Sequence, residues 1–123
     1  MHLFRNDSVI HYGGVVAVFE FISWLSIFLS QRFFAFEWDE GNATKSLRKH
    51  GINTEEAEEI FCDSELLILG LQIFPIAPEE RYAVIGKTET NKILFVCFTI
   101  RNYKIRIISV RNANKKERKV YES

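Results

Sequence analysis

The chain has 123 residues, of which 47% are hydrophobic and 26% are charged. This length and composition indicate one globular domain with a modest core, and they exclude a disordered or fibrous chain. The net charge is zero, but residues 37–80 contain three Lys+Arg against eleven Asp+Glu, and residues 81–123 contain eleven against three. Zero net charge therefore does not exclude a polyanionic partner. Complementary charges within one fold explain the asymmetry equally well.

The N-terminal segment contains an apolar run, residues 15–29, which Glu20 and two serines interrupt. The run is shorter than the ~20 residues that span a bilayer, and it lacks the flanks of a signal peptide. Three interpretations remain: an added strand or helix that covers the core, a weak membrane anchor, or leader sequence translated before the true start. We favour an addition outside the functional domain, with an extension at 1–34 and a domain at 35–123.

A short strand is expected at 33–38, followed by a helix at 40–50. Asp39 is a suitable N-cap, and Gly51 suits the left-handed position after the helix. Leu47 is almost the only apolar residue of this helix, so we expect it to be exposed.

A second helix is expected at 53–61, where Asn53 and Glu56 have the spacing of a capping box. Its buried residues should be Ala57, Ile60 and Phe61. Its acidic residues are expected on a solvated face: Glu55, Glu56, Glu58 and Glu59.

Consecutive β-rich segments follow, and a basic helix is expected at 112–121. The expected strands are 64–76, with a bend at Gly70, then 81–86, 93–100 and 104–110. Strands that follow one another favour an α+β fold. We expect an antiparallel sheet of three to four strands packed by two N-terminal helices and a C-terminal helix.

The last two strands form a predicted hairpin whose second strand contains cations. Strict alternation places these side chains on one face: Lys104, Arg106, Ile108 and Val110. It places these on the other: Ile105, Ile107, Ser109 and Arg111. A buried unpaired charge is costly, so Arg106 or Arg111 should meet a carboxylate, a phosphate ligand or the rim of the sheet.

Cys62 and Cys97 have no CxxC or metal-ligand spacing, and two buried, reduced thiols of a cytosolic protein are expected. The chain contains no GxxxxGK[ST], GxGxxG, HExxH or GxSxG motif, and no cofactor or metal is expected. Cations, hydroxyls and one histidine remain as candidates. Arginine grips phosphate bidentately, so the set suits a phosphodiester, although it also suits structural ion pairs. In RNA, the 2′-hydroxyl can attack the adjacent phosphorus without a metal, given orientation, charge stabilisation and proton transfer.

The order of the residues resembles the BrnT family of bacterial type II toxins. The resemblance spans about residues 36–122 and is carried by these segments: FEWDEGNATKSLRKHGI (36–52), EEAEEIF (55–61), ERYAVIG (80–86), LFVCFTIR (94–101), IRIISVRNA (105–113) and ERKVYE (117–122). It implies a RelE-like α+β fold and a metal-independent endoribonuclease that arrests translation in the cytoplasm. It also implies a BrnA-like ribbon-helix-helix antitoxin that represses the operon, so that operator DNA is bound only through the antitoxin. Membrane association is not expected.

The family motif assigns weight to particular residues of this chain. The catalytic candidates are His50, Arg81, Arg106, Ser109 and Arg111. The RNA-binding candidates are Lys49, Thr99, Arg101 and Lys104. In this hypothesis the arginines neutralise the scissile phosphate, His50 transfers protons, and Ser109 and Thr99 orient phosphate or ribose. Taken alone, a single histidine is more often structural, and Trp38 and Gly51 are interpreted as structural here.

The sequence departs from the family in its long extension before the FEWD segment. Two other hypotheses remain open. One is a non-catalytic partner that only binds the antitoxin and acts as a co-repressor. The other is a generic nucleic-acid-binding module with salt-dependent affinity and no turnover.

Overall fold

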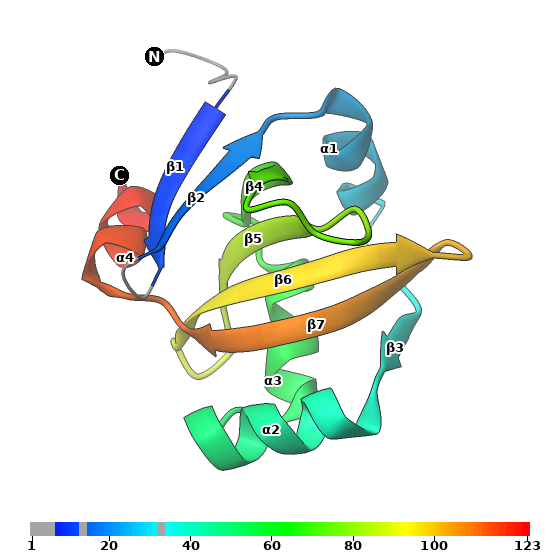
Figure 1. Ribbon diagram of the computed structural model, residues 1–123. Coiled ribbons are helices and arrows are strands. Elements are labelled where there is room, and N and C mark those ends of the chain that lie inside the picture. Colours follow the sequence, from blue (N-terminus) through cyan, green and yellow to red (C-terminus); the bar gives the residue numbers. More distant parts are fainter. Residues whose placement is uncertain (1–6, 13–14, 32–33) are drawn as a thin grey trace.

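A computed structural model describes residues 7–12, 15–31 and 34–123 of the chain (Figure 1). Its strands are β1 (Asp7–Tyr12), β2 (Val15–Glu20), β3 (Phe36–Trp38), β4 (Leu67–Phe74), β5 (Tyr82–Lys87), β6 (Ile93–Arg101) and β7 (Lys104–Asn112). Its helices are α1 (Ser23–Leu29), α2 (Glu40–His50), α3 (Thr54–Glu59), a 3-10 turn (Ile60–Cys62) and α4 (Lys115–Glu122). The strands form one sheet in the order β1-β2-β4-β5-β6-β7-β3.

The α+β class is confirmed, but the predicted sheet is wrong in size and direction. The described residues form seven strands, and β3 runs parallel to β7 while the other neighbours are antiparallel. The predicted helices are present as α2, α3 and α4, and α1 is an additional helix. The three residues of β3 do not indicate whether the strand pairs parallel or antiparallel, and its partner strand lies about 70 residues further along the chain.

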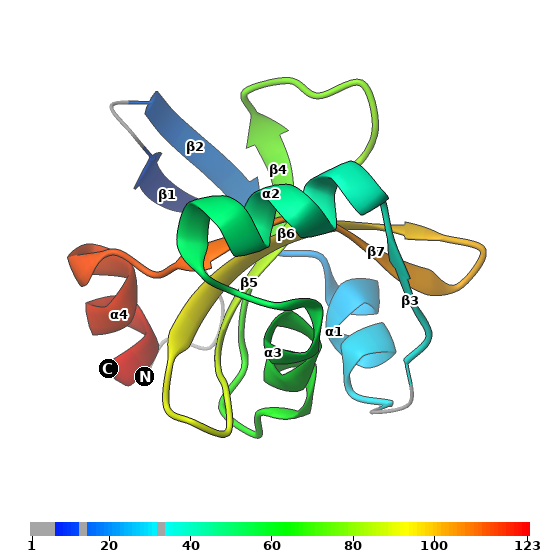
Figure 2. The same cartoon turned by 90° about the horizontal axis from the view of Figure 1, so that it is seen from below.

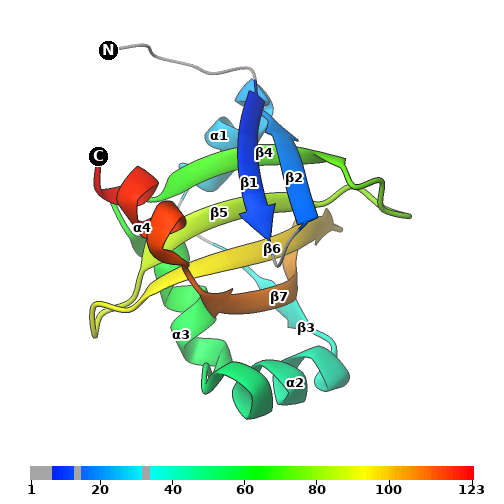
Figure 3. The ribbon, with the colours of Figure 1, turned by 60° about the vertical axis from the view of Figure 1, so that its left-hand side comes forward.

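The hydrophobic core lies on both faces of the sheet. On one face, α1, α3 and the 3-10 turn pack against β5, β6 and β7 through residues that include Leu25, Ala57, Phe61 and Phe98. On the other face, β2 crosses in front of β5 and β6, as Figure 3 shows. Phe19 of β2 is buried there, with its ring 6.4 Å from that of Phe95.

Gly70 permits the close approach of the end of β2 to β4, its antiparallel neighbour. Its φ is +116°, and a Cβ at this position would lie 2.1 Å from the carbonyl oxygen of Glu20. Only glycine combines that backbone angle with so close an approach. The predicted bend at Gly70 is thus the point where the N-terminal strands join the sheet.

A bulge in β7 corrects the predicted distribution of its side chains. Phe98 lies opposite Ile107, but Cys97 lies opposite Ser109, so Ile108 is an extra residue in β7. Residues directly opposite in a sheet point to the same face. The bulge therefore brings Arg106 onto the face that carries Ser109, whereas strict alternation had separated them.

Helix α2 begins and ends as the sequence predicts, and it lies beside β7 (Figure 2). The Asp39 carboxylate accepts hydrogen bonds from the backbone N–H groups of Gly41 (2.8 Å) and Asn42 (3.2 Å). Gly51 follows with a φ of +67°, and Leu47 is exposed, as expected.

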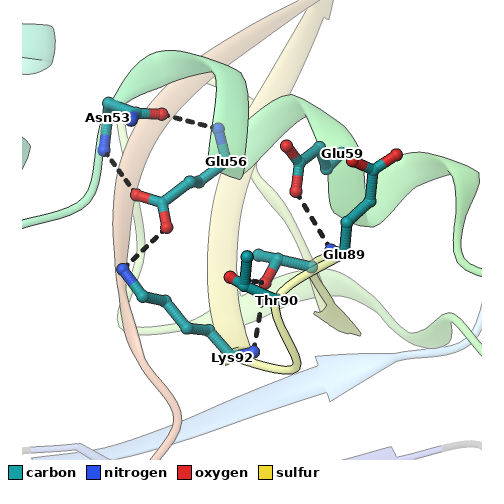
Figure 4. A network of polar contacts seen from close by, with 7 residues as sticks. Asn53, Glu56, Glu59, Glu89, Thr90 and Lys92 are labelled. Carbon is teal, nitrogen blue, oxygen red and sulfur yellow. Dashed lines mark hydrogen bonds and ion pairs between the residues drawn. The ribbon is translucent and has the colours of Figure 1, made fainter.

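The acidic side chains of α3, predicted to form a solvated face, make several internal contacts (Figure 4). Glu56 pairs with the Lys92 amine at 2.6 Å, and Glu59 accepts a bond from the backbone N–H of Glu89. Glu58 accepts a bond from the Trp38 indole, and Glu55 is exposed. The buried residues Ala57, Ile60 and Phe61 are confirmed.

Two further predictions concern helix α4 and the cysteines. Asn114 and Glu117 form a capping box at the start of α4, so this helix begins after Asn114. Both thiols are free, as expected, but Cys62 is exposed and only Cys97 is buried. Cys62 ends the turn after α3, where its neighbour Phe61 fills the core instead.

Candidate functional site

Seven of the nine candidate side chains lie on the sheet face opposite α1 and α3, which we call the cationic face, whereas Lys49 and His50 belong to helix α2. Opposite pairs of β6 and β7 define the cationic face: Phe95 with Arg111, Cys97 with Ser109, Thr99 with Arg106, and Arg101 with Lys104. Arg81 directly precedes β5, whose Tyr82 pairs with Phe98, so Arg81 comes next to Thr99 on the same face. The fold thus brings together the predicted arginines and hydroxyls from three adjacent strands.

Within the described residues, Arg81 is the arginine of this face that has no internal carboxylate partner. Its side-chain Nε is buried and, within the described part of the chain, forms no hydrogen bond. The guanidinium also has no carboxylate within ion-pair distance among these residues. A buried donor without a partner is costly, so this nitrogen is a favourable position for an anionic ligand.

Arg106 and Arg101 meet carboxylates at the surface. Arg106 lies 3.3 Å from Glu37 and 3.6 Å from Asp39, and Arg101 lies 3.5 Å from Glu79. These pairs are long and partly solvated, so each is worth little, on the order of 1 kcal/mol or less. A phosphate can therefore compete for either guanidinium.

Arg111 is held much more firmly. Its two terminal nitrogens donate to the two carboxylate oxygens of Glu117, at 2.7 and 2.8 Å, and its guanidinium lies 4.3 Å from the centre of the Phe95 ring. Glu117 is only 1% exposed. A bidentate, desolvated pair of this kind fixes α4 to the sheet.

His50, at the end of α2, lies close enough to Arg111 to respond to its charge. Burial, and then the positive charges of Lys49, Arg111 and Lys45, lower the pKa of His50 below 6.5. The imidazole is therefore neutral at physiological pH and able to accept a proton. His50 is thus a group able to accept a proton at the C-terminal end of α2, the helix that lies beside β7.

The remaining candidates differ in access. Thr99 is buried and Ser109 is half-buried, whereas Lys49, Arg101 and Lys104 are exposed. Burial raises the pKa of the Cys97 thiol to about 11, so Cys97 is an unreactive neighbour of Ser109. Ser109 is therefore the accessible hydroxyl at the centre of the face.

Sequence reasoning missed the carboxylates that hold the cations. Glu37, Glu79 and Glu117 belong to three different segments, and nothing in the local sequence pairs them with particular arginines. Within the described residues, no group of three His, Cys, Asp or Glu side chains could hold a metal ion. None of the helices described there has the length and apolar character that crossing a membrane requires.

A small α+β fold with guanidinium and hydroxyl groups on one sheet face, and an imidazole on a helix beside that sheet, belongs to the class of proteins suited to bind a phosphodiester. The family model described as "Ribonuclease toxin, BrnT, of type II toxin-antitoxin system" matches residues 38–117. The chain belongs to this family. It is accordingly a ribonuclease toxin of a type II toxin–antitoxin system, which has an antitoxin as its partner.

The fold is also similar to that of a solved structure, the 1.1 Å crystal structure of the Brucella abortus ribonuclease toxin BrnT. The two share 22% sequence identity with a TM-score of 0.50, over 68% of this chain and 100% of that chain. No curated protein sequence matches the chain. The strands β1 and β2 and helix α1 precede the segment that the family model matches.

Proposed function

We propose that this toxin is a metal-independent endoribonuclease that cuts RNA on the cationic face and thereby arrests translation. The observation that carries the proposal is the bulge in β7, because it gives Arg106, Ser109 and Arg111 one common face. Arg81 adds to that face a buried nitrogen that forms no hydrogen bond with the residues the structure describes. Together these groups suit a phosphate with its attached ribose.

The chemistry uses the substrate's own nucleophile. His50, neutral at physiological pH, accepts the proton of the ribose 2′-hydroxyl, whose oxygen attacks the adjacent phosphorus. Arg81 and Arg106 stabilise the added negative charge, and Ser109 and Thr99 orient phosphate or ribose. The bond to the 5′-oxygen breaks, that oxygen takes up a proton, and a 2′,3′-cyclic phosphate remains. Arg111 contributes charge from its fixed position against Glu117.

The partner proposed for this toxin is a BrnA-like ribbon-helix-helix antitoxin, through which the complex reaches operator DNA. Because the proposed substrate is RNA that is being translated, we propose that the toxin acts in the cytoplasm. The exposed cations Lys49, Arg101 and Lys104 border the face and are proposed to hold the RNA backbone on either side of the cut.

One observation favours the alternative of a non-catalytic antitoxin partner and co-repressor. Three of the predicted cations meet internal carboxylates: Arg101, Arg106 and Arg111. If those pairs persist in the presence of RNA, Arg81 is the one arginine of the cationic face that is left for a phosphate among the described residues. The ion pairs of Arg106 are long and solvated, so a phosphate can displace the carboxylates. For that reason we favour the enzyme over the non-catalytic partner.

Induced expression in bacteria separates the two functions. We expect the wild type to arrest growth with fragmented RNA, and Arg81→Gln and Arg106→Gln to relieve both effects while remaining folded. Lys116→Gln, which removes an exposed charge from α4, serves as the matched control. Growth arrest with intact RNA would support the alternative instead.

A further inference from the structure

A hollow of about 760 Å³ lies between α4, the turn before β6 and the end of β7. Residues 91–93 and 112–113 form two sides of it, and four residues of α4 form the third. The backbone N–H of Ala113 donates to the carbonyl of Ile93 at 2.9 Å and joins the first two sides. We call this hollow the α4 groove.

Helix α4 presents a row of cations to the groove. Lys115, Arg118 and Lys119 line it with Glu122, at the i, i+3, i+4 and i+7 positions of one helix face. The helix can present this face because Glu117 and Tyr121 anchor the other side, through Arg111 and Asp63. The row is therefore held in a fixed orientation toward the groove.

These cations have no internal partner in the described part of the chain. Lys92, across the groove, pairs with Glu56, but none of Lys115, Arg118 and Lys119 lies within ion-pair distance of a carboxylate there. Charges at such spacing repel one another, and Glu122, the acidic residue that lines the groove, offsets only part of their attraction for a polyanion. Among the described residues, the α4 groove thus carries an excess of positive charge, with Lys115, Arg118 and Lys119 against Glu122.

The α4 groove also adjoins the cationic face. Asn112 lines the groove and its carbonyl accepts a bond from Arg111, the last arginine of that face. We propose that the α4 groove binds the sugar–phosphate backbone of the single-stranded RNA substrate on one side of the scissile phosphate. This proposal rests on the proposed function, which it extends from one phosphate to a path along the protein surface.

Helix α4 supplies a matched pair of variants for the test. Lys119 lines the groove and Lys116 does not, although both are exposed lysines of the same helix. Lys119→Gln and Lys116→Gln therefore make the same change in total charge. The probe is a fluorescent single-stranded 2′-O-methyl oligonucleotide, which lacks the nucleophile and cannot be cut, titrated against the full chain at several salt concentrations.

We expect Lys119→Gln to reduce the slope of log affinity against log salt by about 0.7, the effect of one phosphate contact with a single strand. The double variant Arg118→Gln/Lys119→Gln should lose about twice that slope and roughly twentyfold in affinity at 0.1 M salt. Lys116→Gln should leave the slope unchanged. Thermal melts check that the variants remain folded.

Two results would overturn the proposal, and they are distinguishable. If the wild type binds the probe and cuts ordinary RNA, but the double variant keeps the wild-type affinity and slope, the groove assignment alone fails. If the wild type neither binds the probe nor cuts RNA, the proposed function fails together with the groove.

Discussion

Arg111 is a charged strand residue that both lies on the cationic face and stabilises the fold. Its guanidinium lies over the Phe95 ring and also donates two hydrogen bonds to the buried carboxylate of Glu117. The sequence predicts that such a cation must find a carboxylate, a phosphate or the rim. The carboxylate six residues further on is not recognisable from sequence as that partner, because Glu117 also reads as an ordinary capping residue.

Glu117→Gln should therefore destabilise the fold strongly. Removing one member of a buried pair leaves the other charge uncompensated, at a cost of about 3 kcal/mol or more in the free energy of unfolding. Urea unfolding measures this, with Arg118→Gln on the exposed side of α4 as the control. A loss below about 1 kcal/mol would show that Arg111 is solvated in solution and available to RNA.

His50 gives the site a dependence on pH whose sign follows from its lowered pKa. The neutral imidazole is the base, so kcat/KM should rise with pH through a pKa below 6.5 and then level off. Lys49→Gln removes one of the charges that lower this pKa and should move the acid limb to higher pH. His50→Gln should abolish this rise of kcat/KM at low pH. An unaltered acid limb in His50→Gln would assign the base to another group.

Among the elements, those with strong local signals are predicted well and those that depend on distant partners are not. The caps of α2 and α3 and the β6–β7 hairpin follow from residues within one turn or strand of each other. The parallel pairing of β3 and the bulge at Ile108 do not, because each is set by packing against another element. The bulge matters most for function, since it decides which arginines share a face.

The close pairing of β2 with β4 can be tested at Gly70. Gly70→Ala should cost well over 1 kcal/mol of unfolding free energy, because its Cβ would collide with the Glu20 carbonyl. Gly51→Ala is the matched control: its φ is also positive, but a Cβ there meets no atom within 4 Å, so only about 1 kcal/mol is expected. Equal losses in the two variants, measured by chemical denaturation, would contradict the close approach of β2.

In the whole molecule, internal ion pairs neutralise only part of the charge difference between the acidic and basic segments of the sequence. Pairs such as Arg106–Glu37, Lys92–Glu56 and Arg101–Glu79 join the basic C-terminal segment to the acidic segment before it. The interpretation of complementary halves is thus confirmed for these cations. In the described part of the chain, the cations of α4 that line its groove and Arg81 on the cationic face have no carboxylate within ion-pair distance and are available to an external anion. The sequence alone could not separate them from the paired cations.

The most direct test of RNA cleavage on the cationic face is the digestion of a defined RNA by the purified full chain in the presence of EDTA, with the new termini identified by mass spectrometry. We expect fragments ending in 2′,3′-cyclic phosphate and 5′-hydroxyl groups, and a rate about a hundredfold lower for Arg81→Gln, as for the loss of one transition-state donor. Cleavage that requires added Mg²⁺, fragments with 5′-phosphates, or an undiminished rate for Arg81→Gln would contradict it.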